Sequence, residues 1–429
     1  MKRKLLMLVL TVCSISLTSF AQNVNYDESK IEPYTLEDPL RFADGRKVKN
    51  KRDWELRRQE ILDIFQHEMY GQMPPRSDIF LEPLEQGTTL AGFGLRRQVR
   101  MWFRADKTGP HIDWLIVTPA QARGPVSAIL LLNYQGNQSV MRDNEILDVT
   151  SLDAPTNLFP NGTPRGKFAN ANEDNWFPTS MMLARGYALV TACYCDISPD
   201  PTQPEAQEKY AYTRCFELWP KRDPGRDDNT TSLNAWAWGL MRAMDMIEQD
   251  PMLDASRVLL TGYSRLGKAA LIAGAFDERF PVVVPVQTGG GGAPLAKRNF
   301  GENISTEVKA FTHWYCPAYR KYAGHEGQMP FDQHLLLACV APRALLVEGF
   351  DQPWFDTKGE FLALQAASPV WEKFCKKGLP RVGWPDDFDT SAIGPRLGYV
   401  RRNQEHGISS YDWTWMMDFA DGVFSTQVK

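Results

Sequence analysis

The chain has 429 residues, 43% of them hydrophobic, and a formal net charge of −4. This length supports a large buried core, and the weak charge gives no general attraction to nucleic acid or to an anionic membrane surface. Its 13 Trp residues can bind sugars where they are exposed, although we expect most of them in the core. Six of the seven cysteines follow residue 21 and none forms a CxxC pair, so neither a disulfide scaffold nor a structural zinc site is expected.

Residues 1–21 have the pattern of an export signal. A basic start precedes an apolar run too short for a good membrane span, and small residues stand before a cut after Ala21. Val12 before Cys13 does not fit a lipoprotein cleavage site. We therefore expect an exported protein, periplasmic or secreted, whose mature chain 22–429 has no membrane span.

Secondary-structure signals divide the mature chain into an N-terminal part and a longer alternating part. Apolar spacing predicts a helix over 52–69, and the segments 96–105 and 111–120 have the pattern of antiparallel strands. Short apolar runs then alternate with helical patterns, of which 234–250 is the clearest. The apolar runs lie at 128–134, 187–194, 257–263, 280–287 and 344–350. This alternation indicates a mostly parallel sheet covered on both faces, in one catalytic domain with an N-terminal extension.

Polar residues follow three of these apolar runs, namely Ser264, Gln287 and Asp351. In parallel sheets, functional groups gather at the carboxyl ends of the strands. Ser264 lies near Gly262 and Gly267, small neighbours that a strained strand-to-helix turn requires, although a helix N-cap is the simpler role for a serine. A nucleophilic serine needs a base and an orienting acid. The chain offers a serine, a later acid and a late histidine, which is the order of α/β-hydrolases.

Among the six histidines, His406 fits the base best. It follows a polar loop and precedes a glycine, where the last loop of such a hydrolase lies. His313 and His334 flank apolar helical segments and are expected in the core, whereas His67 is expected on the surface of the first helix. The glycine run 288–292 lacks a phosphate-loop lysine, so we interpret it as backbone that passes close beneath the site.

The stretch GYSRLGKAALIAGAFDERF, residues 262–280, resembles the G-C-S-R-x-G-K signature of the glucuronoyl esterases, carbohydrate esterase family 15. Further similar segments lie between residues 61 and 413. The resemblance implies an α/β-hydrolase fold, a three-layer sandwich with a mostly parallel central sheet and N-terminal antiparallel strands, and no metal or cofactor. It also implies cleavage of esters between 4-O-methyl-glucuronoyl groups of xylan and lignin alcohols.

The resemblance extends to individual site residues. Ser264 matches the nucleophile, His406 the base, and Arg265 the arginine that stabilises the oxyanion. The matched positions that hold the uronate sugar are Lys268, Glu302 and Trp354. Cations are unfavourable in the first turn of a helix, so Arg265 and Lys268 together call for an anionic or polar partner.

The triad acid departs from the family pattern. Gln287 stands where fungal members carry the triad glutamate, and bacterial members often move the acid to the loop after the next strand. Asp351, just past that strand, is the expected acid. Glu348 and Asp356 are the alternatives, although Asp356 is more easily explained as a helix N-cap. The loop that carries these candidates is also shorter than is usual in the family.

A second departure concerns a disulfide. Tyr263 replaces the signature cysteine, which in fungal members is bonded to the residue after the histidine, and Gly407 occupies that place here. The two changes agree with each other, since together they remove a disulfide and leave the chemistry.

Two other functions remain possible at this point. One is an acetyl-xylan esterase or general carboxylesterase, and the other is an inactive hydrolase-fold protein that binds carbohydrate through its tryptophans. The intact Ser264 and His406 argue against the inactive protein. We expect a monomer whose partner is glucuronoxylan or a lignin–carbohydrate ester, with no nucleic-acid partner and no membrane attachment after signal cleavage.

Overall fold

The computed structural model describes residues 24–148, 176–380 and 383–427, so the export signal expected over residues 1–21 lies outside the described residues. A single nine-stranded sheet runs through this part of the chain, in the order β1-β2-β3-β5-β4-β6-β7-β8-β9. The strands β1 to β3 and β5 pair antiparallel, and from β5 onward every neighbouring pair is parallel. The bounds are β1 Phe80–Thr89, β2 Gly94–Trp102, β3 His111–Pro119, β4 Val126–Asn133, β5 Tyr187–Cys193, β6 Leu253–Tyr263, β7 Val282–Val286, β8 Ala344–Phe350 and β9 Leu397–Arg402.

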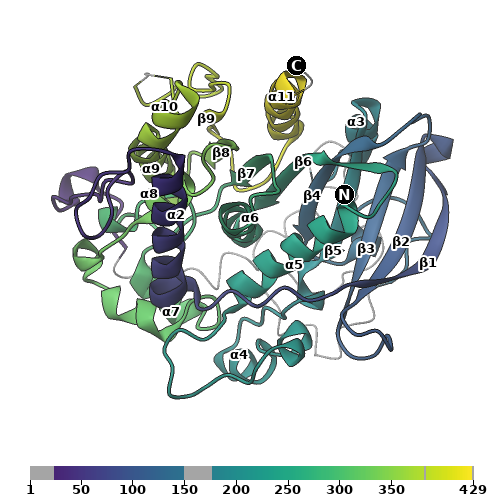
Figure 1. Ribbon diagram of the computed structural model, residues 1–429, viewed down its shortest axis with the longest axis horizontal. Coiled ribbons are helices and arrows are strands. Elements are labelled where there is room, and N and C mark those ends of the chain that lie inside the picture. The colour runs from purple at the N-terminus through teal and green to yellow at the C-terminus, as the bar shows by residue number, and fades with distance from the viewer. Residues whose placement is uncertain (1–23, 149–175, 381–382, 428–429) are drawn as a thin grey trace, which may run out of the picture.

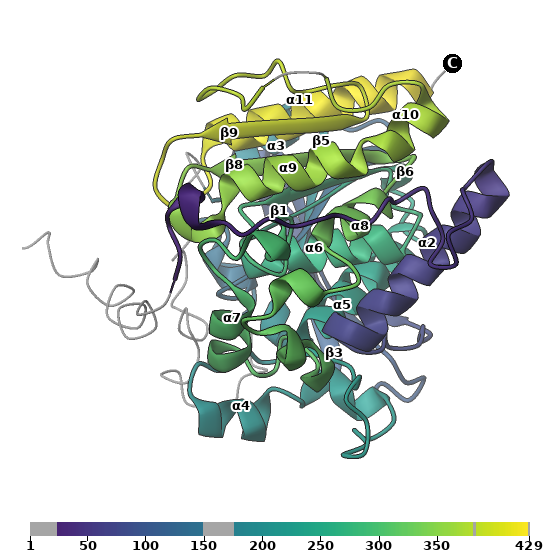
Figure 2. The ribbon, with the colours of Figure 1, turned by 90° about the vertical axis from the view of Figure 1, so that its left-hand side faces the viewer.

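Helices cover both faces of the sheet, as Figures 1 and 2 show. One buried apolar cluster joins the sheet to α2, α5, α6, α8 and α9, and a second joins its other face to α3 and α11. This confirms the three-layer α/β fold with N-terminal antiparallel strands. The bounds are α2 Lys51–Phe65, α3 Thr179–Ala184, α4 Pro204–Tyr210, α5 Ser232–Ile247, α6 Arg265–Phe276, α7 Ile304–Ala310, α8 Gln333–Ala338, α9 Thr357–Ala367, α10 Pro369–Cys375 and α11 Ser410–Gln427.

The apolar runs of the sequence form the central strands. Every residue of β5, β7 and β8 is buried, which is the pattern of parallel strands covered on both faces. The predicted helix over 52–69 is observed as α2, extended by a π-helical turn to Tyr70. Two strands were not predicted: β1, which pairs with β2 at one edge of the sheet, and β9, which pairs with β8 at the other.

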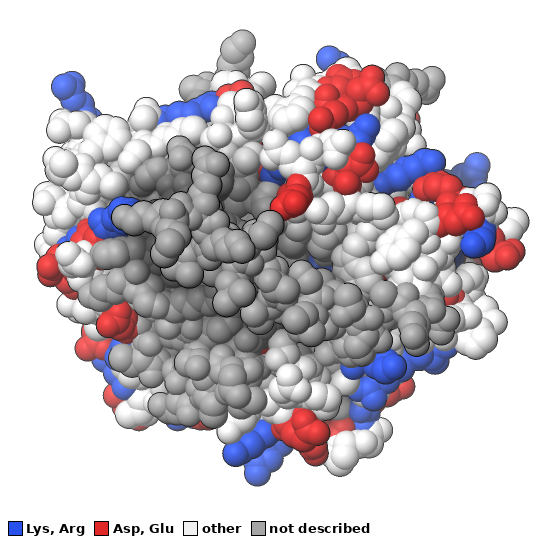
Figure 3. All heavy atoms as spheres, turned by 180° about the vertical axis from the view of Figure 1, so that it is seen from behind, with Lys and Arg blue, Asp and Glu red and all other residues white. Residues whose placement is uncertain are grey.

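The segment before α2 crosses the molecular surface beside α8 and α9, as Figure 2 shows. Ion pairs attach it to the body: Glu28 lies 2.5 Å from Arg298, and Glu37 lies 2.7 Å from Lys297. On the face drawn in Figure 3, Lys and Arg side chains are interspersed with Asp and Glu. No helix within the described ranges is long and apolar enough to cross a membrane.

Candidate active site

Ser264 lies on a strained turn between β6 and α6. Its φ of 57° and ψ of −128° are unusual for a residue with a side chain, and the side chain makes no capping bond to the helix. A Cβ atom on Gly262 would lie 2.2 Å from the Leu266 carbonyl oxygen, and one on Gly267 would lie 2.8 Å from the Gly262 carbonyl oxygen. Both glycines are therefore needed for the turn. The geometry is that of a nucleophile elbow rather than of an ordinary N-cap.

Arg265, the next residue, is held by a buried carboxylate that the sequence did not single out. Its guanidinium lies 2.5 Å from Asp200, which also accepts hydrogen bonds from Trp314 at 2.9 Å and Tyr194 at 3.1 Å and lies 2.7 Å from the His313 ring. Burial alone would raise the pKa of Asp200, but Arg265 and these hydrogen bonds hold it below its usual value. Asp200 thus fixes the guanidinium beside the serine.

Lys268 is buried and faces two carboxylates. Its ammonium lies 3.5 Å from Glu302 and 3.6 Å from Glu307, and it lies 4.9 Å from the centre of the Trp314 ring. Glu307 accepts a short hydrogen bond from the Tyr315 hydroxyl. Burial raises the pKa of Glu307 to about 8, with Glu302 adding to the shift and Lys268 opposing it. Sequence reasoning missed Glu307, because an acid in the first turn of a helix is readily explained by the helix dipole.

The loops that carry Glu302 and Trp354 are joined to each other. The Glu302 amide donates to the Trp354 carbonyl oxygen at 2.6 Å, and the half-buried Trp354 lies in the short helix Pro353–Phe355. Gly289 has a φ of +66°, and a Cβ atom there would lie 2.4 Å from a Glu302 carboxylate oxygen. The glycine run therefore passes close to Glu302. The structure therefore brings Lys268, Glu302 and Trp354 into one neighbourhood.

His406 lies in the loop between β9 and α11, against aromatic rings. Its ring stacks on Phe355 with centroids 4.3 Å apart and an interplanar angle of 11°, and contacts Tyr263 at 4.5 Å. No ion pair joins it to a carboxylate among the residues the structure describes; Asp351, the expected acid, instead contacts Arg401. Although the residue keeps exposed surface, burial of its ring lowers its pKa, and the positive charges of Arg265 and Lys268 lower it further.

The three candidate acids have different surroundings. Asp351 pairs with Arg401 at 2.8 Å, and its side chain is 45% exposed. Asp356 caps α9 through the Gly359 amide and pairs with Arg298 at 2.8 Å, in agreement with the N-cap explanation. Glu348 is buried, and neither of its carboxylate oxygens has a hydrogen-bond partner in the described part of the chain.

The charge state of Glu348 follows from its place in β8. Burial raises its pKa well above the usual value; the neighbouring Asp412 adds to the shift and Arg402 opposes it. Burial therefore favours the neutral, protonated form of Glu348. Gln287, at the family's other acid position, is also buried and donates to the Phe350 carbonyl oxygen at 3.1 Å, which is a structural role.

His67, His313 and His334 lie where the sequence predicts. His67 has a 61% exposed side chain, whereas His313 and His334 are fully buried. All six cysteines within the described residues are free. No group of three or more His, Cys, Asp or Glu side chains in the described segments is arranged to hold a metal ion.

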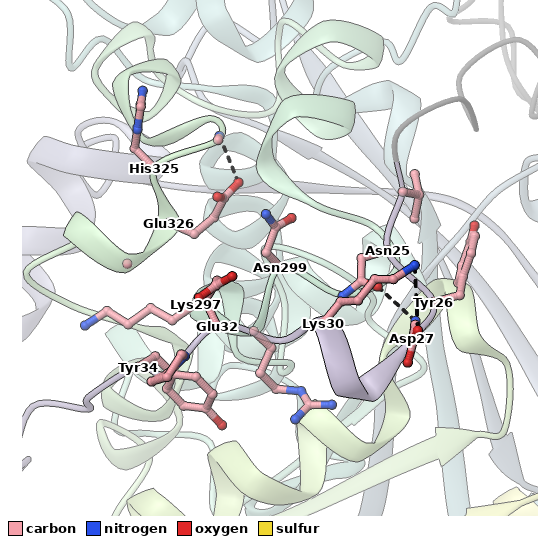
Figure 4. Close-up of a pocket in the computed structure, with 15 residues that line it drawn as sticks. Asn25, Tyr26, Asp27, Lys30, Glu32, Tyr34, Lys297, Asn299, His325 and Glu326 are labelled. Atoms are coloured by element: carbon pink, nitrogen blue, oxygen red, sulfur yellow. Dashed lines mark hydrogen bonds and ion pairs between the residues drawn. The ribbon is translucent and has the colours of Figure 1, made fainter.

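A separate cavity of about 650 Å³ lies between the segment before α2 and the turn at 324–327, and Figure 4 shows its lining. The cations along its wall already have partners: Lys30 pairs with Asp27 at 3.6 Å, and Lys297 pairs with Glu37. The cavity therefore offers no unpaired lysine or arginine to an anionic ligand.

Comparison with known proteins shows what the chain is similar to. A family model described as "Glucuronyl esterase, fungi" matches residues 179–375. A carbohydrate esterase from an unknown prokaryotic organism is 33% identical over 98% of this chain and 98% of its own length. The 4-O-methyl-glucuronoyl methylesterase of Podospora anserina is 26% identical over 84% of this chain and 63% of its own length.

Solved structures agree with these relatives. A promiscuous esterase of carbohydrate esterase family 15 from a marine bacterial metagenome has a TM-score of 0.83 and 32% identity, covering 93% of this chain and 100% of its own. The glucuronoyl esterase of Solibacter usitatus has a TM-score of 0.83 and 34% identity, covering 92% of this chain and 99% of its own.

Proposed function

Since the chain belongs to the glucuronoyl esterases of carbohydrate esterase family 15, we propose that it is a serine esterase that cleaves esters between (4-O-methyl-)glucuronoyl groups of xylan and lignin alcohols. The observation that carries this proposal is the elbow at Ser264. A strained, non-capping serine at the carboxyl end of a parallel strand is the arrangement that acyl transfer requires. The partly buried Arg265 follows it directly, and the buried Lys268 lies four positions after it.

The proposed reaction has two steps. His406 takes the proton of Ser264 as the serine oxygen attacks the ester carbonyl, and Arg265 stabilises the negative charge that develops on the carbonyl oxygen. The imidazolium then gives its proton to the leaving alcohol. Water, activated by the same histidine, hydrolyses the acyl-enzyme and releases the uronate.

Sugar recognition falls to three further residues in this proposal. Lys268 and Glu302 offer a cation and a carboxylate, which bind sugar hydroxyls through charge-assisted hydrogen bonds. Trp354 offers an indole that can cover the sugar ring or bond to it. Their shared neighbourhood beside the elbow supports the assignment.

We keep Asp351 as the proposed triad acid. In that pair the Asp351 side chain is 45% exposed and the Arg401 side chain is 11% exposed, so Asp351 has to release one partly buried contact to serve His406. Glu348 would have to ionise in a buried site to stabilise an imidazolium. Asp356 would have to leave both Arg298 and the helix cap.

The test of the proposed function is a comparison of three substrates on the purified full chain. We expect the benzyl ester of glucuronic acid to be hydrolysed with a higher kcat/KM than the benzyl ester of galacturonic acid or an acetyl ester. A preference for the acetyl ester would favour a general carboxylesterase, a possibility that the promiscuous relative keeps open. No turnover of any ester, together with no labelling of Ser264 by a fluorophosphonate, would indicate an inactive carbohydrate-binding protein.

Export and domain organisation are also proposals. We propose cleavage after Ala21 and a single catalytic domain over 22–429 that acts as a monomer in the periplasm or outside the cell. N-terminal sequencing of the exported protein and its sedimentation in solution test these points.

A further inference from the structure

The ring of His406 contacts two aromatic side chains, neither of which is a serine, histidine or acid of a catalytic triad. Phe355 lies nearly parallel to it at 4.3 Å, and Tyr263 lies at 4.5 Å with an interplanar angle of 38°. We call Phe355 and Tyr263 the aromatic pair. Tyr263 is the last residue of β6 and directly precedes Ser264, so the pair joins the histidine loop to the elbow itself.

Both members of the aromatic pair are held by their own neighbours. Tyr263 is buried and stacks on Phe350 with centroids 6.1 Å apart, and the Arg402 guanidinium lies 3.8 Å from the centre of the Phe350 ring. Phe355 lies over Gly289, where a Cβ atom would come within 2.9 Å of its ring. Each member of the pair is therefore held by its own neighbours, and the His406 ring rests on the pair although the residue keeps exposed surface.

The backbone around His406 is fixed separately. Arg402 makes a bidentate pair with the buried Asp412 at 2.7 Å and donates to the Gly407 carbonyl oxygen. These contacts set the path of the loop but do not reach the imidazole. Among the described residues, the ring contacts of His406 are aromatic, and no carboxylate bonds to it.

A general base must meet two conditions, a fixed orientation and a neutral ring. In a serine triad, an acid fixes the imidazole and stabilises its charged form. Here, we propose that Phe355 and Tyr263 are positioning residues that hold the imidazole of His406 in the orientation in which it takes the proton of Ser264. This inference rests on the proposed function, in which His406 is the base.

The charges that face His406 act in one direction. From α6, Arg265 and Lys268 both disfavour the imidazolium, and from β6 the buried Tyr263 is a neutral phenol at working pH. Phe355 excludes water from one face of the ring. Burial of the ring and these two positive charges lower the pKa of His406. The base form therefore persists to a lower pH than in water.

The experiment compares Phe355→Leu, which keeps apolar volume but removes the stacked ring, with Phe355→Tyr, which restores it. We expect Phe355→Leu to lower kcat by roughly ten- to a hundredfold with little change in KM, because the base is misplaced. The acid limb of its pH profile should move to higher pH, because water again reaches the imidazole and the pKa of His406 rises. Phe355→Tyr should return both quantities close to the parent values.

The matched control is Phe388→Leu, which removes a ring that is 39% exposed and packs on Tyr411 and Trp415 instead of His406. It should leave kcat and the acid limb unchanged. Phe355→Leu with the parent's kcat and acid limb would overturn the proposal. So would a loss of kcat in Phe355→Leu that Phe355→Tyr does not restore although thermal melting shows it folded.

The rate at which a fluorophosphonate labels Ser264 reports the reactivity of the serine without any ester substrate. It therefore tests this inference separately from the proposed substrate. If the parent labels rapidly but does not hydrolyse glucuronate esters, the proposed substrate is wrong. A slower labelling of Phe355→Leu would then still support the aromatic pair. If His406→Ala labels as fast as the parent, His406 is not the base and the inference fails with it.

Discussion

The two sides of the elbow are built in opposite ways. On the side of α6, each cation faces an acid: Arg265 faces Asp200, and Lys268 faces Glu302, with Glu307 also 3.6 Å from its ammonium. On the opposite side, the imidazole of His406 contacts aromatic rings and pairs with no described carboxylate. We refer to these regions as the cation side and the histidine side.

The difference shows how one small site holds two charged cations beside a histidine that must stay neutral. Guanidinium and ammonium groups can be buried beside an elbow only when acids compensate them, since an uncompensated buried charge is strongly destabilising. A general base has the reverse requirement, because it must stay neutral until it takes a proton. Aromatic neighbours and nearby cations satisfy that requirement, whereas a fixed carboxylate would favour the protonated ring.

The largest effect is expected at Ser264, which both sides serve. Ser264→Ala should reduce turnover of the benzyl ester of glucuronic acid by roughly three to six orders of magnitude, because triad members act as a unit. Thermal melting should show an intact fold. A purified, folded variant that kept a tenth of the activity would exclude the elbow as the catalytic centre.

The second prediction asks whether the histidine side works without a carboxylate. Asp351→Asn should lower kcat by roughly a hundredfold or more if Asp351 turns to His406 during catalysis. Glu348→Gln should have little effect, since burial already favours the neutral form of Glu348.

Near-normal turnover in Asp351→Asn with a collapse in Glu348→Gln would move the acid to the buried position. Near-normal turnover in both would leave the aromatic pair as the principal support of His406. Asp356→Asn is the matched control, and it should mainly lower the melting temperature because Asp356 caps α9 and pairs with Arg298.

The fold was largely predictable because its central strands are continuous apolar runs between helical patterns. The strands β1 and β9 were missed for physical reasons. β1 carries Glu82, Pro83 and Glu85, which resemble a loop until the ladder with β2 supplies their backbone partners. β9 ends in Arg402, which is buried only because Asp412 on a later helix compensates its charge.

The site was predictable only in part, for a similar reason. A short motif and the order of residues along the chain indicate Ser264 and His406. Asp200, Glu307 and Phe355 have no such motif, and each contacts a site candidate on another element. Asp200 is 65 positions before Arg265, in a proline-rich stretch typical of a turn. Contacts of this kind appear only when the chain is folded.

The third prediction perturbs the cation side. Asp200→Asn should lower kcat by roughly tenfold to thirtyfold, since Arg265 would lose the carboxylate that aims it at the oxyanion. KM should change less than kcat, because the guanidinium acts on the transition state. A rise in KM with unchanged kcat would instead mean that the Arg265–Asp200 pair serves substrate binding.

The fourth prediction concerns sugar recognition on the same side. Lys268→Ala and Glu302→Ala should each raise KM for the glucuronate ester by about tenfold, the cost of one lost charge-assisted hydrogen bond. KM for a small acetyl ester should rise much less, since it lacks the sugar hydroxyls. Equal losses on both substrates would show that Lys268 and Glu302 support the site structurally.

The smallest effect is expected at Glu307, behind Lys268. Burial raises its pKa to about 8, so the folded protein binds this proton more tightly than the unfolded chain does. The resulting stability is fully present below the usual pKa of a glutamate and is lost as pH rises through about 8. The melting temperature of the parent should therefore fall over this interval, and Glu307→Gln, which cannot ionise, should show a weaker fall.

Because ionised Glu307 competes with substrate for the Lys268 ammonium, KM of the parent should also rise by about twofold to fivefold above this pH. The same pH step in Glu307→Gln would assign the titration to another group.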